Sequence, residues 1–146
     1  MHYRKSTRRD AKNEAVLDML RVSAKVANAP WDYRGLVLPM LAAGNVVIAF
    51  TDNHEYQPVG FIFYIKQVMP DTNRLAVIER LLFVLPENRG KTLGVGKGLL
   101  DTLVRIARED GALDIFAGSS LDNNEHTKRL YEGAGFKTTY AFKKEL

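Results

Sequence analysis

The sequence PENRGKTLGVGKGLL, residues 86–100, is the most informative stretch of the chain, because it joins two apolar segments through a loop rich in glycine. It contains Gly90, Gly94, Gly96 and Gly98 together with the basic residues Arg89, Lys91 and Lys97. A strand, a glycine-rich turn and a helix form a recurrent phosphate site, since backbone N–H groups point inward and the helix N-terminus carries partial positive charge. The stretch therefore predicts a loop that binds an anionic ligand.

Two common phosphate loops do not fit this stretch. A Walker loop needs a glycine five residues before Gly-Lys-Thr, and Leu85 occupies that position. The dinucleotide fingerprint begins correctly at Gly94 and Gly96 but has Leu99 at its third glycine position, and no parallel βαβαβ repeat surrounds it. Neither a nucleotide triphosphate nor a dinucleotide is the expected ligand.

Outward from the loop, apolar periodicity predicts the secondary structure. Helices are expected over residues 10–28, with Asp10 as N-cap, over 31–44 and from the glycine loop to Asp110. Strands are expected over 46–50, 59–68 and 74–85, the first two as an antiparallel hairpin, and then over 112–119. A last helix over 121–135, capped by Asp122, precedes a strand over 136–146, where Phe136, Thr138, Tyr140 and Phe142 alternate. The expected order is strand, two helices, three strands, helix, strand, helix, strand.

This order predicts an α/β (α+β) fold, with a mixed, mostly antiparallel sheet of about six to seven strands flanked by about four helices. The 146 residues suit one domain, residues 1–146, and the 46% hydrophobic and 26% charged composition is normal for a globular protein. The chain has no cysteine and three scattered histidines, so neither a disulfide nor a metal site is expected. With no apolar run near the ~20 residues of a membrane span and no secretory signal, we expect a cytoplasmic protein with no membrane partner.

Two segments read together resemble the GNAT superfamily of N-acetyltransferases. In LLFVLPENRGKTLGVGKGLL, residues 81–100, the matching positions are Leu82, Val84, Pro86, Arg89, Gly90, Gly94 and Gly96. In NNEHTKRLYEGAGF, residues 123–136, they are Asn124, Leu130, Tyr131, Gly135 and Phe136. The Arg-Gly pair lies two residues earlier than in the usual motif, so either Lys91 replaces the arginine or Thr92 and Leu93 are an insertion.

The resemblance implies a GNAT fold that binds acetyl-CoA as cosubstrate, without a metal. The loop would hold the CoA pyrophosphate, the strand before it would offer backbone groups to pantetheine, Asn124 would contact the pantetheine or phosphate region, and Tyr131 would donate its hydroxyl to the departing sulfur. The implied cofactor-binding residues are Phe83, Val84, Leu85, Arg89, Gly90, Lys91, Thr92, Leu93, Gly94, Val95, Gly96, Lys97, Asn124 and Tyr131.

The acceptor must attack as a free amine, which calls for a base. Glu79, on the strand that enters the site, is the candidate by resemblance, and a surface ion pair with Arg80 is the alternative. Trp31 and Tyr33 are candidate acceptor-binding residues, although Trp31 after Pro30 equally suits a packing role. The expected acceptor is an amine on a protein or a small molecule. Many members of the superfamily dimerise, so a homodimer is one option for this chain.

A competing hypothesis comes from charge. The net charge is +4, and Arg4, Lys5, Arg8 and Arg9 cluster near the N-terminus. Such a balance favours anionic partners through long-range attraction. The alternative function is therefore a nucleic-acid-associated module on the same fold, or acetylation of an amine carried on RNA.

Overall fold

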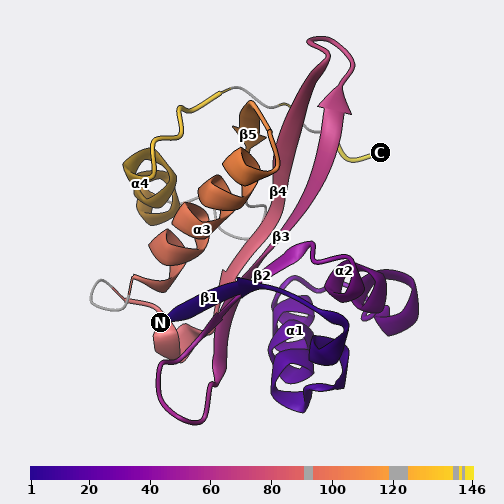
Figure 1. The fold of residues 1–146 in the computed structure, drawn as a ribbon, viewed down its shortest axis with the longest axis vertical. Helices are drawn as coiled ribbons and strands as arrows, with labels where there is room; N and C mark the ends of the chain where they lie inside the picture. Colours follow the sequence, from indigo (N-terminus) through magenta and orange to yellow (C-terminus); the bar gives the residue numbers. More distant parts are fainter. Residues whose placement is uncertain (91–93, 119–124, 140–141, 143) are drawn as a thin grey trace.

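The central feature of the computed structural model is a five-stranded sheet in the order β1-β2-β3-β4-β5 (Figure 1). The structure describes residues 1–90, 94–118, 125–139, 142 and 144–146. The first four strands pair antiparallel, and β4 pairs with β5 in parallel. Their bounds are β1 His2–Lys5, β2 Val46–Phe50, β3 Pro58–Met69, β4 Arg74–Val84 and β5 Asp114–Phe116.

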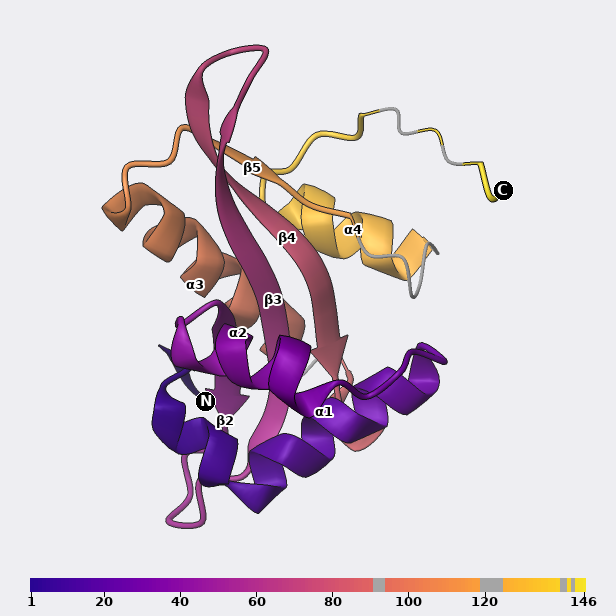
Figure 2. The same cartoon turned by 90° about the vertical axis from the view of Figure 1, so that its right-hand side faces the viewer.

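Helices cover both faces of the sheet (Figures 1 and 2). On one face lie α1, Glu14–Val26, and α2, Leu38–Ala42, which follows a π-helical turn at Tyr33–Val37. On the other lie α3, Val95–Glu109, and α4, Glu125–Gly133. Short 3-10 turns occur at Arg8–Lys12 and Pro86–Asn88. The predicted mixed fold with helices on a mostly antiparallel sheet is confirmed. Within the described ranges, no helix is long and apolar enough to cross a bilayer.

Successive strand residues point to opposite faces of the sheet, and this alternation builds two cores. The core under α1 and α2 contains Phe61 and Phe83, whose rings lie 5.7 Å apart. The core under α3 contains Ile62, Tyr64 and Leu103. The hydroxyl of the buried Tyr64 donates to the Gly44 carbonyl at 2.8 Å, and burial raises the pKa of Tyr64 to about 12.

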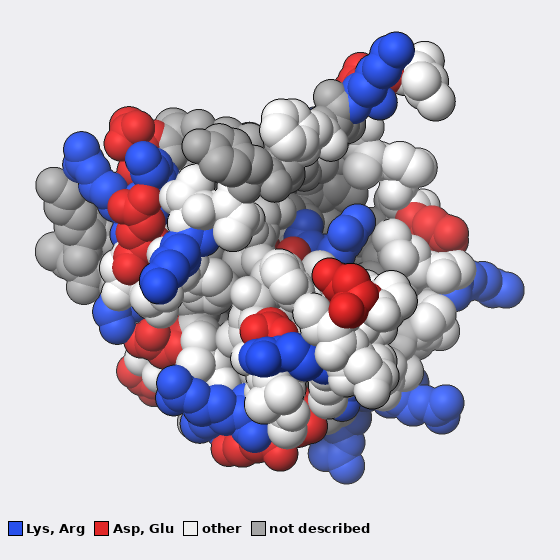
Figure 3. Space-filling view, turned by 90° about the horizontal axis from the view of Figure 1, so that it is seen from above, with Lys and Arg blue, Asp and Glu red and all other residues white. Residues whose placement is uncertain are grey.

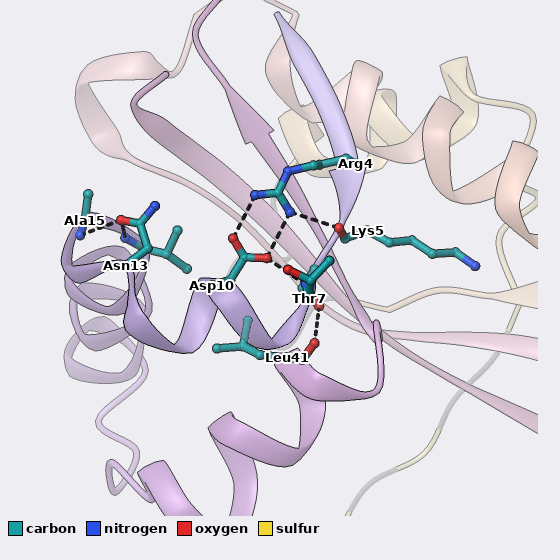
Figure 4. A network of polar contacts seen from close by, with 9 residues as sticks. Arg4, Lys5, Thr7, Asp10, Asn13, Ala15 and Leu41 are labelled. Atoms are coloured by element: carbon teal, nitrogen blue, oxygen red, sulfur yellow. Dashed lines mark hydrogen bonds and ion pairs between the residues drawn. The ribbon is translucent and has the colours of Figure 1, made fainter. Parts of the chain in front are cut away.

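A polar network joins β1 to the start of α1 (Figure 4). The Arg4 guanidinium donates to both Asp10 carboxylate oxygens, at 2.8 and 2.9 Å, and the Thr7 backbone N–H donates to Asp10 at 2.7 Å. Burial acts to raise the pKa of Asp10, but the hydrogen bonds from Arg4 and Thr7 outweigh it and lower that pKa. The expectation that Asp10 caps the first helix is wrong: Asn13 caps it, accepting from the N–H groups of Ala15 and Val16.

The C-terminal segment differs from its prediction. Residues 136–139, 142 and 144–146 form no strand, so the described sheet has five strands rather than six or seven. An alternating segment becomes a strand only where a neighbour supplies hydrogen bonds and a surface that buries its apolar side. The Phe142 side chain is 96% exposed and has no such surface. The strand predicted over 112–119 is also shorter than expected, since β5 has three residues.

Candidate active site

The glycine loop leads from the end of β4 into α3, as the sequence predicts. Gly90 has φ +152° and Gly94 has φ +59°, and the latter residue is the N-cap of α3. Left-handed backbone of this kind favours glycine because it has no Cβ. Gly94 has no side chain, and no described side chain caps the first N–H groups of this 15-residue helix. The expected ligands Lys91, Thr92 and Leu93 lie outside the described residues, as does Asn124.

The first turn of α3 has mixed roles. Val95 is buried in the core under the helix, so it contributes packing and only its backbone could meet a ligand. Gly96 faces α4, where an added Cβ would lie 3.1 Å from Leu130. Lys97 is exposed and forms an ion pair with Asp101 at 2.7 Å. The glycine at 96 therefore permits the close approach of α4, a packing reason that the sequence did not reveal.

Arg89 is bound to the strand that it follows. Its Nε donates to the Val84 carbonyl at 2.7 Å, and its guanidinium carbon lies 5.4 Å from the centre of the Phe83 ring. The Leu85 N–H donates to Val59 on β3, so the backbone groups of Val84 point the other way, because successive strand residues alternate. Among the residues expected to meet pantetheine, Phe83 is a core residue by its side chain, and Val84 presents its N–H at the free side of β4.

The pairing between β4 and β5 ends near the middle of β4. The two strands pair only through Ala76, Val77 and Ile78, and β4 then continues to Val84 without β5. A bulge follows at once: Tyr64 on β3 pairs with Glu79 and Phe63 with Leu81, so Arg80 is an extra residue. A bulge bends a strand and increases its twist. It also sends Leu81 into the α1 core while Glu79 turns toward α4.

Glu79 is buried, with 2% of its surface exposed, so the alternative of a surface ion pair is wrong. Its Oε2 accepts the backbone N–H of Gly118 at 3.1 Å, just beyond β5. Burial raises the pKa of Glu79, and the Gly118 N–H, the Tyr131 hydroxyl and the charge of Arg80 offset part of that rise. A buried carboxyl with a raised pKa that lines a groove is a candidate for proton transfer.

Tyr131 reaches the same place from α4. Its ring packs edge-on against Phe136, with centroids 5.6 Å apart. Its hydroxyl and Glu79 Oε1 are both buried, and neither has a hydrogen-bond partner of normal geometry among the described residues. Burial raises the pKa of Tyr131, and the nearby carboxylate of Glu79 raises it further. The structure thus brings together the two residues that sequence reasoning proposed as catalytic.

A groove of about 1300 Å³ opens beside this pair, between β4, β5 and α4. Glu79, Gly118 and Tyr131 line it, together with Phe116 and Phe136. A smaller hollow of about 370 Å³ lies between α3 and Ala134 and contains neither Glu79 nor Tyr131. The larger groove is therefore the candidate active site.

Trp31 and Tyr33 lie away from this groove. Their rings stack with centroids 6.4 Å apart, and Arg21 lies over Trp31. The Tyr33 hydroxyl donates to the Ala11 carbonyl at 3.0 Å, and both rings pack against the core under α1 and α2. These contacts give both residues a packing role.

Sequence reasoning missed one part of the site and misjudged another. No pattern pointed to Gly118, whose contribution is a backbone N–H. Arg80 was expected only as a surface ion-pair partner of Glu79, although both residues lie inside the apolar run LAVIERLLFVL, residues 75–85. An acidic side chain within a buried strand is rare unless it has a partner.

Comparisons with known proteins identify the family and the fold. Residues 42–138 match the family described as Acetyltransferase (GNAT) domain. No curated relative matches the sequence. Among solved structures, a probable acetyltransferase superposes with a TM-score of 0.77 at 20% identity, covering 100% of this chain and 96% of its own.

Two other solved structures carry printed activities. A ribosomal-protein-alanine N-acetyltransferase from Brucella melitensis biovar Abortus has a TM-score of 0.76 at 20% identity, covering 100% of this chain and 99% of its own. An aminoglycoside acetyltransferase from an uncultured soil metagenomic sample, in complex with trehalose, has a TM-score of 0.73 at 14% identity, with coverages of 99% and 95%. The fold is common to all of them. The matched family domain spans most of this chain, which therefore belongs to the GNAT acetyltransferase family.

Proposed function

We propose that this chain is a single-domain N-acetyltransferase that transfers the acetyl group of acetyl-CoA directly to a primary amine of a protein or small-molecule acceptor. The observation that carries the proposal is the placement of two features along β4. A glycine-capped helix start follows its end, and the Glu79–Tyr131 pair lies beside its middle. Glu79 and Val84 pair with Tyr64 and Gly60 on β3, four residues apart, so they are separated by roughly 14 Å along the strand at about 3.4 Å per residue.

A ligand that uses both features must be long, with an anionic end and a reactive end. CoA has this form, since its pyrophosphate suits the start of α3 and its thioester would reach Glu79 and Tyr131. The Val84 N–H, on the free side of β4, is available to an amide of the connecting arm. The loop residues 89–97 and Asn124 are the proposed phosphate and pantetheine contacts.

The proposed roles of the pair follow from acidity. A free amine must lose a proton as it is acylated, and Glu79 is the carboxylate that would take it. A phenol of pKa ~10 does not readily protonate a thiol of pKa ~8.5, but its hydrogen bond stabilises the developing thiolate. Direct transfer is supported by the absence of cysteine from the sequence, which leaves no thiol to carry an acyl group.

The proposed acceptor is a primary amine, without a choice between a protein and a small molecule. The structural neighbours named above include a ribosomal-protein-alanine N-acetyltransferase and an aminoglycoside acetyltransferase. A first acceptor panel would therefore hold peptides with N-terminal alanine, a lysine peptide, an aminoglycoside and a polyamine. Because the chain carries a net charge of +4, approach of a highly cationic polyamine is opposed by long-range repulsion.

The test is isothermal titration of the purified protein with acetyl-CoA and with CoA, beside ATP and NAD. We expect micromolar binding of the two CoA species and none of ATP or NAD. Acetyl-CoA consumption is then followed with each acceptor of the panel. A folded protein that binds neither CoA species would overturn the proposal.

The nucleic-acid alternative has less support. Of the four basic residues near the N-terminus, Arg4 is bound to Asp10, and Lys5 lies 3.9 Å from Asp110. On the face seen in Figure 3, basic and acidic side chains are interspersed. Nucleic-acid binding of the electrostatic kind falls steeply with salt. Binding of tRNA that weakens between low and moderate salt would revive this alternative.

A further inference from the structure

Three cationic side chains line the groove, and none of them has a hydrogen-bond or ion-pair partner among the described residues. They come from β4, α3 and the segment that follows α4, and are Arg80, Arg108 and Lys137. All three are exposed. Elsewhere on α3, Lys97 and Arg105 are paired with carboxylates at 2.7 and 3.0 Å. The groove therefore holds positive charge that no described side chain neutralises.

The acidic side chains of the groove do not balance this charge. Two of them are already in ion pairs, at 2.8 and 3.8 Å, and these pairs are Asp114–Arg74 and Glu132–Lys128. Burial raises the pKa of Glu79 and so favours its neutral form. Glu125 is the remaining exposed carboxylate of the described lining. Three free cations against one free carboxylate make the groove attractive to an anion.

The phosphates of CoA would lie at the other end of α3. The proposed phosphate site is residues 89–97, and none of those that the structure describes lines the groove. Arg108 follows Val95 by 13 residues of the same helix, which at about 1.5 Å per residue is roughly 20 Å. The phosphates would therefore be beyond the reach of the Arg108 side chain. The positive charge in the groove is thus available to a second anion.

The bulge in β4 brings Arg80 beside the candidate base. Successive strand residues normally point to opposite faces, yet Glu79 and Arg80 both line the groove. Arg80 is the extra residue of the bulge, and a bulge re-aims a side chain in this way. Its charge also reaches the Glu79 carboxyl, where it offsets part of the rise in pKa. An amine that meets Glu79 therefore has its neighbouring atoms close to Arg80.

We propose that the acceptor carries an anionic group, a carboxylate or a phosphate, close to its amine, and that Arg80 binds this group with support from Arg108 and Lys137. The inference rests on the proposed function and adds the chemical class of its acceptor. A guanidinium donates two parallel N–H bonds to either oxyanion, which fixes the orientation of the bound group. Phe116, 46% exposed in the same groove, offers an apolar surface to the rest of the acceptor. Polyamines and aminoglycosides, which are cationic, should then be poor acceptors.

The first test needs no acetyl transfer. Protein saturated with CoA is titrated with succinate, with inorganic phosphate and with uncharged succinamide, while backbone amide resonances are followed by NMR. We expect saturable shifts at Arg80 and Gly118 with at least one oxyanion and none with succinamide. The oxyanion that binds identifies the preferred group. Its affinity should fall about tenfold or more in Arg80→Gln. Absence of saturable shifts, shifts confined to residues 89–97, or parent-like affinity in Arg80→Gln would overturn the inference.

Arg105→Gln is the matched control for this titration. Arg105 lies on α3 one turn before Arg108, pairs with Glu109 at 3.0 Å and does not line the groove. Its substitution removes one cation from the same helix and leaves the lining intact. Oxyanion affinity should therefore stay close to that of the parent protein. Equal losses in Arg105→Gln and Arg80→Gln would show a general effect of net charge and contradict a specific site.

The second test compares matched acceptors. The dipeptide amides Ala-Glu, Ala-Gln and Ala-Lys differ in one side-chain charge, and phosphoethanolamine is set beside ethanolamine. The anionic member should have a kcat/KM about tenfold to a hundredfold above its neutral partner. Arg80→Gln should shrink this ratio, and Arg80→Glu should reverse it in favour of Ala-Lys. Preference of the unsubstituted protein for Ala-Lys over Ala-Glu would overturn the inference.

The two tests separate this inference from the proposed function. A protein that binds no CoA species fails the proposed function, whatever its response to oxyanions. A protein that binds CoA but no oxyanion in the groove keeps the proposed function and loses the inference. If none of the matched acceptors is acetylated, the titration of the CoA-saturated protein decides.

Discussion

The two faces of the sheet are packed in different ways. On one face α1 buries five residues, and the aromatic side chains of Phe61, Phe63 and Phe83 fill the layer beneath it. On the other face α3 buries seven residues, but α4 beside it buries none and instead borders the groove. The helix that carries Tyr131 therefore depends on partial contacts. The buried packing lies in the two cores rather than at α4, so substitutions in the cores and on α4 should separate folding from chemistry.

The largest effect is expected in the aromatic layer under α1. Phe61→Ala should lower the free energy of unfolding by about 3–5 kcal/mol, because a fully buried ring is lost and a cavity remains. Leu130→Ala on α4 is the matched change on the other face and should cost roughly 1–2 kcal/mol, since Leu130 is only partly buried. Urea unfolding measures both. A greater loss for Leu130→Ala would reverse the comparison.

A second contrast is between glycines on the groove side. Gly94→Val should weaken CoA binding by about tenfold or more, because a branched residue resists left-handed backbone and would intrude where phosphate approaches. Gly133→Val is the control, since an added Cβ there meets nothing within 4 Å. Calorimetric titration with CoA compares the two. Parent-like affinity in Gly94→Val would place the phosphate elsewhere.

A third prediction concerns pH. Burial raises the pKa of Glu79, so its protonated form is favoured in the folded state. The stability that this group contributes is complete below the usual carboxyl pKa, at about pH 4, and is lost as pH rises through the raised folded-state value. Glu79→Gln lacks this loss and should gain stability relative to the parent protein between pH 4 and pH 7.

Urea unfolding at the two pH values tests the sign. Glu132→Gln, an exposed change on α4, should show no comparable trend. If the glutamine at 79 instead became relatively less stable toward neutral pH, the carboxylate would be stabilised by its surroundings, contrary to the structure.

The smallest effect is expected at the surface of α3. Lys97→Ala removes an exposed ion pair with Asp101 and should change the unfolding free energy by less than about 0.5 kcal/mol. The effect of Lys97→Ala on CoA affinity tests whether the Lys97 side chain contacts phosphate. A loss of affinity that diminishes at high salt would support a contact with phosphate, while no change would leave the backbone of the helix start as the binding group.

Much of the fold could be predicted because its signals are local. The β-branched and aromatic runs correctly predicted the β2–β3 hairpin and β4. The helical spacing of Leu99, Leu103 and Ile106 correctly predicted α3. The C-terminal segment was mispredicted because alternation alone does not supply a neighbouring strand. In the site, Tyr131 and Glu79 were found as separate residues. Their proximity depends on the bulge at Arg80 and on the Gly118 N–H, and neither is encoded in a local pattern.

The extra residue Arg80 affects the curvature of β4 but not the face to which each of its side chains points. Glu79 and Leu81 already point to opposite faces, so deleting Arg80 would join them as ordinary neighbours and leave every side chain of β4 on its present face. What would change is curvature, because the bend that accompanies the divergence of β4 from β5 would relax. A one-residue gap at this position in an aligned relative would therefore signal a straighter strand and a narrower opening, with its acidic residue unchanged in orientation.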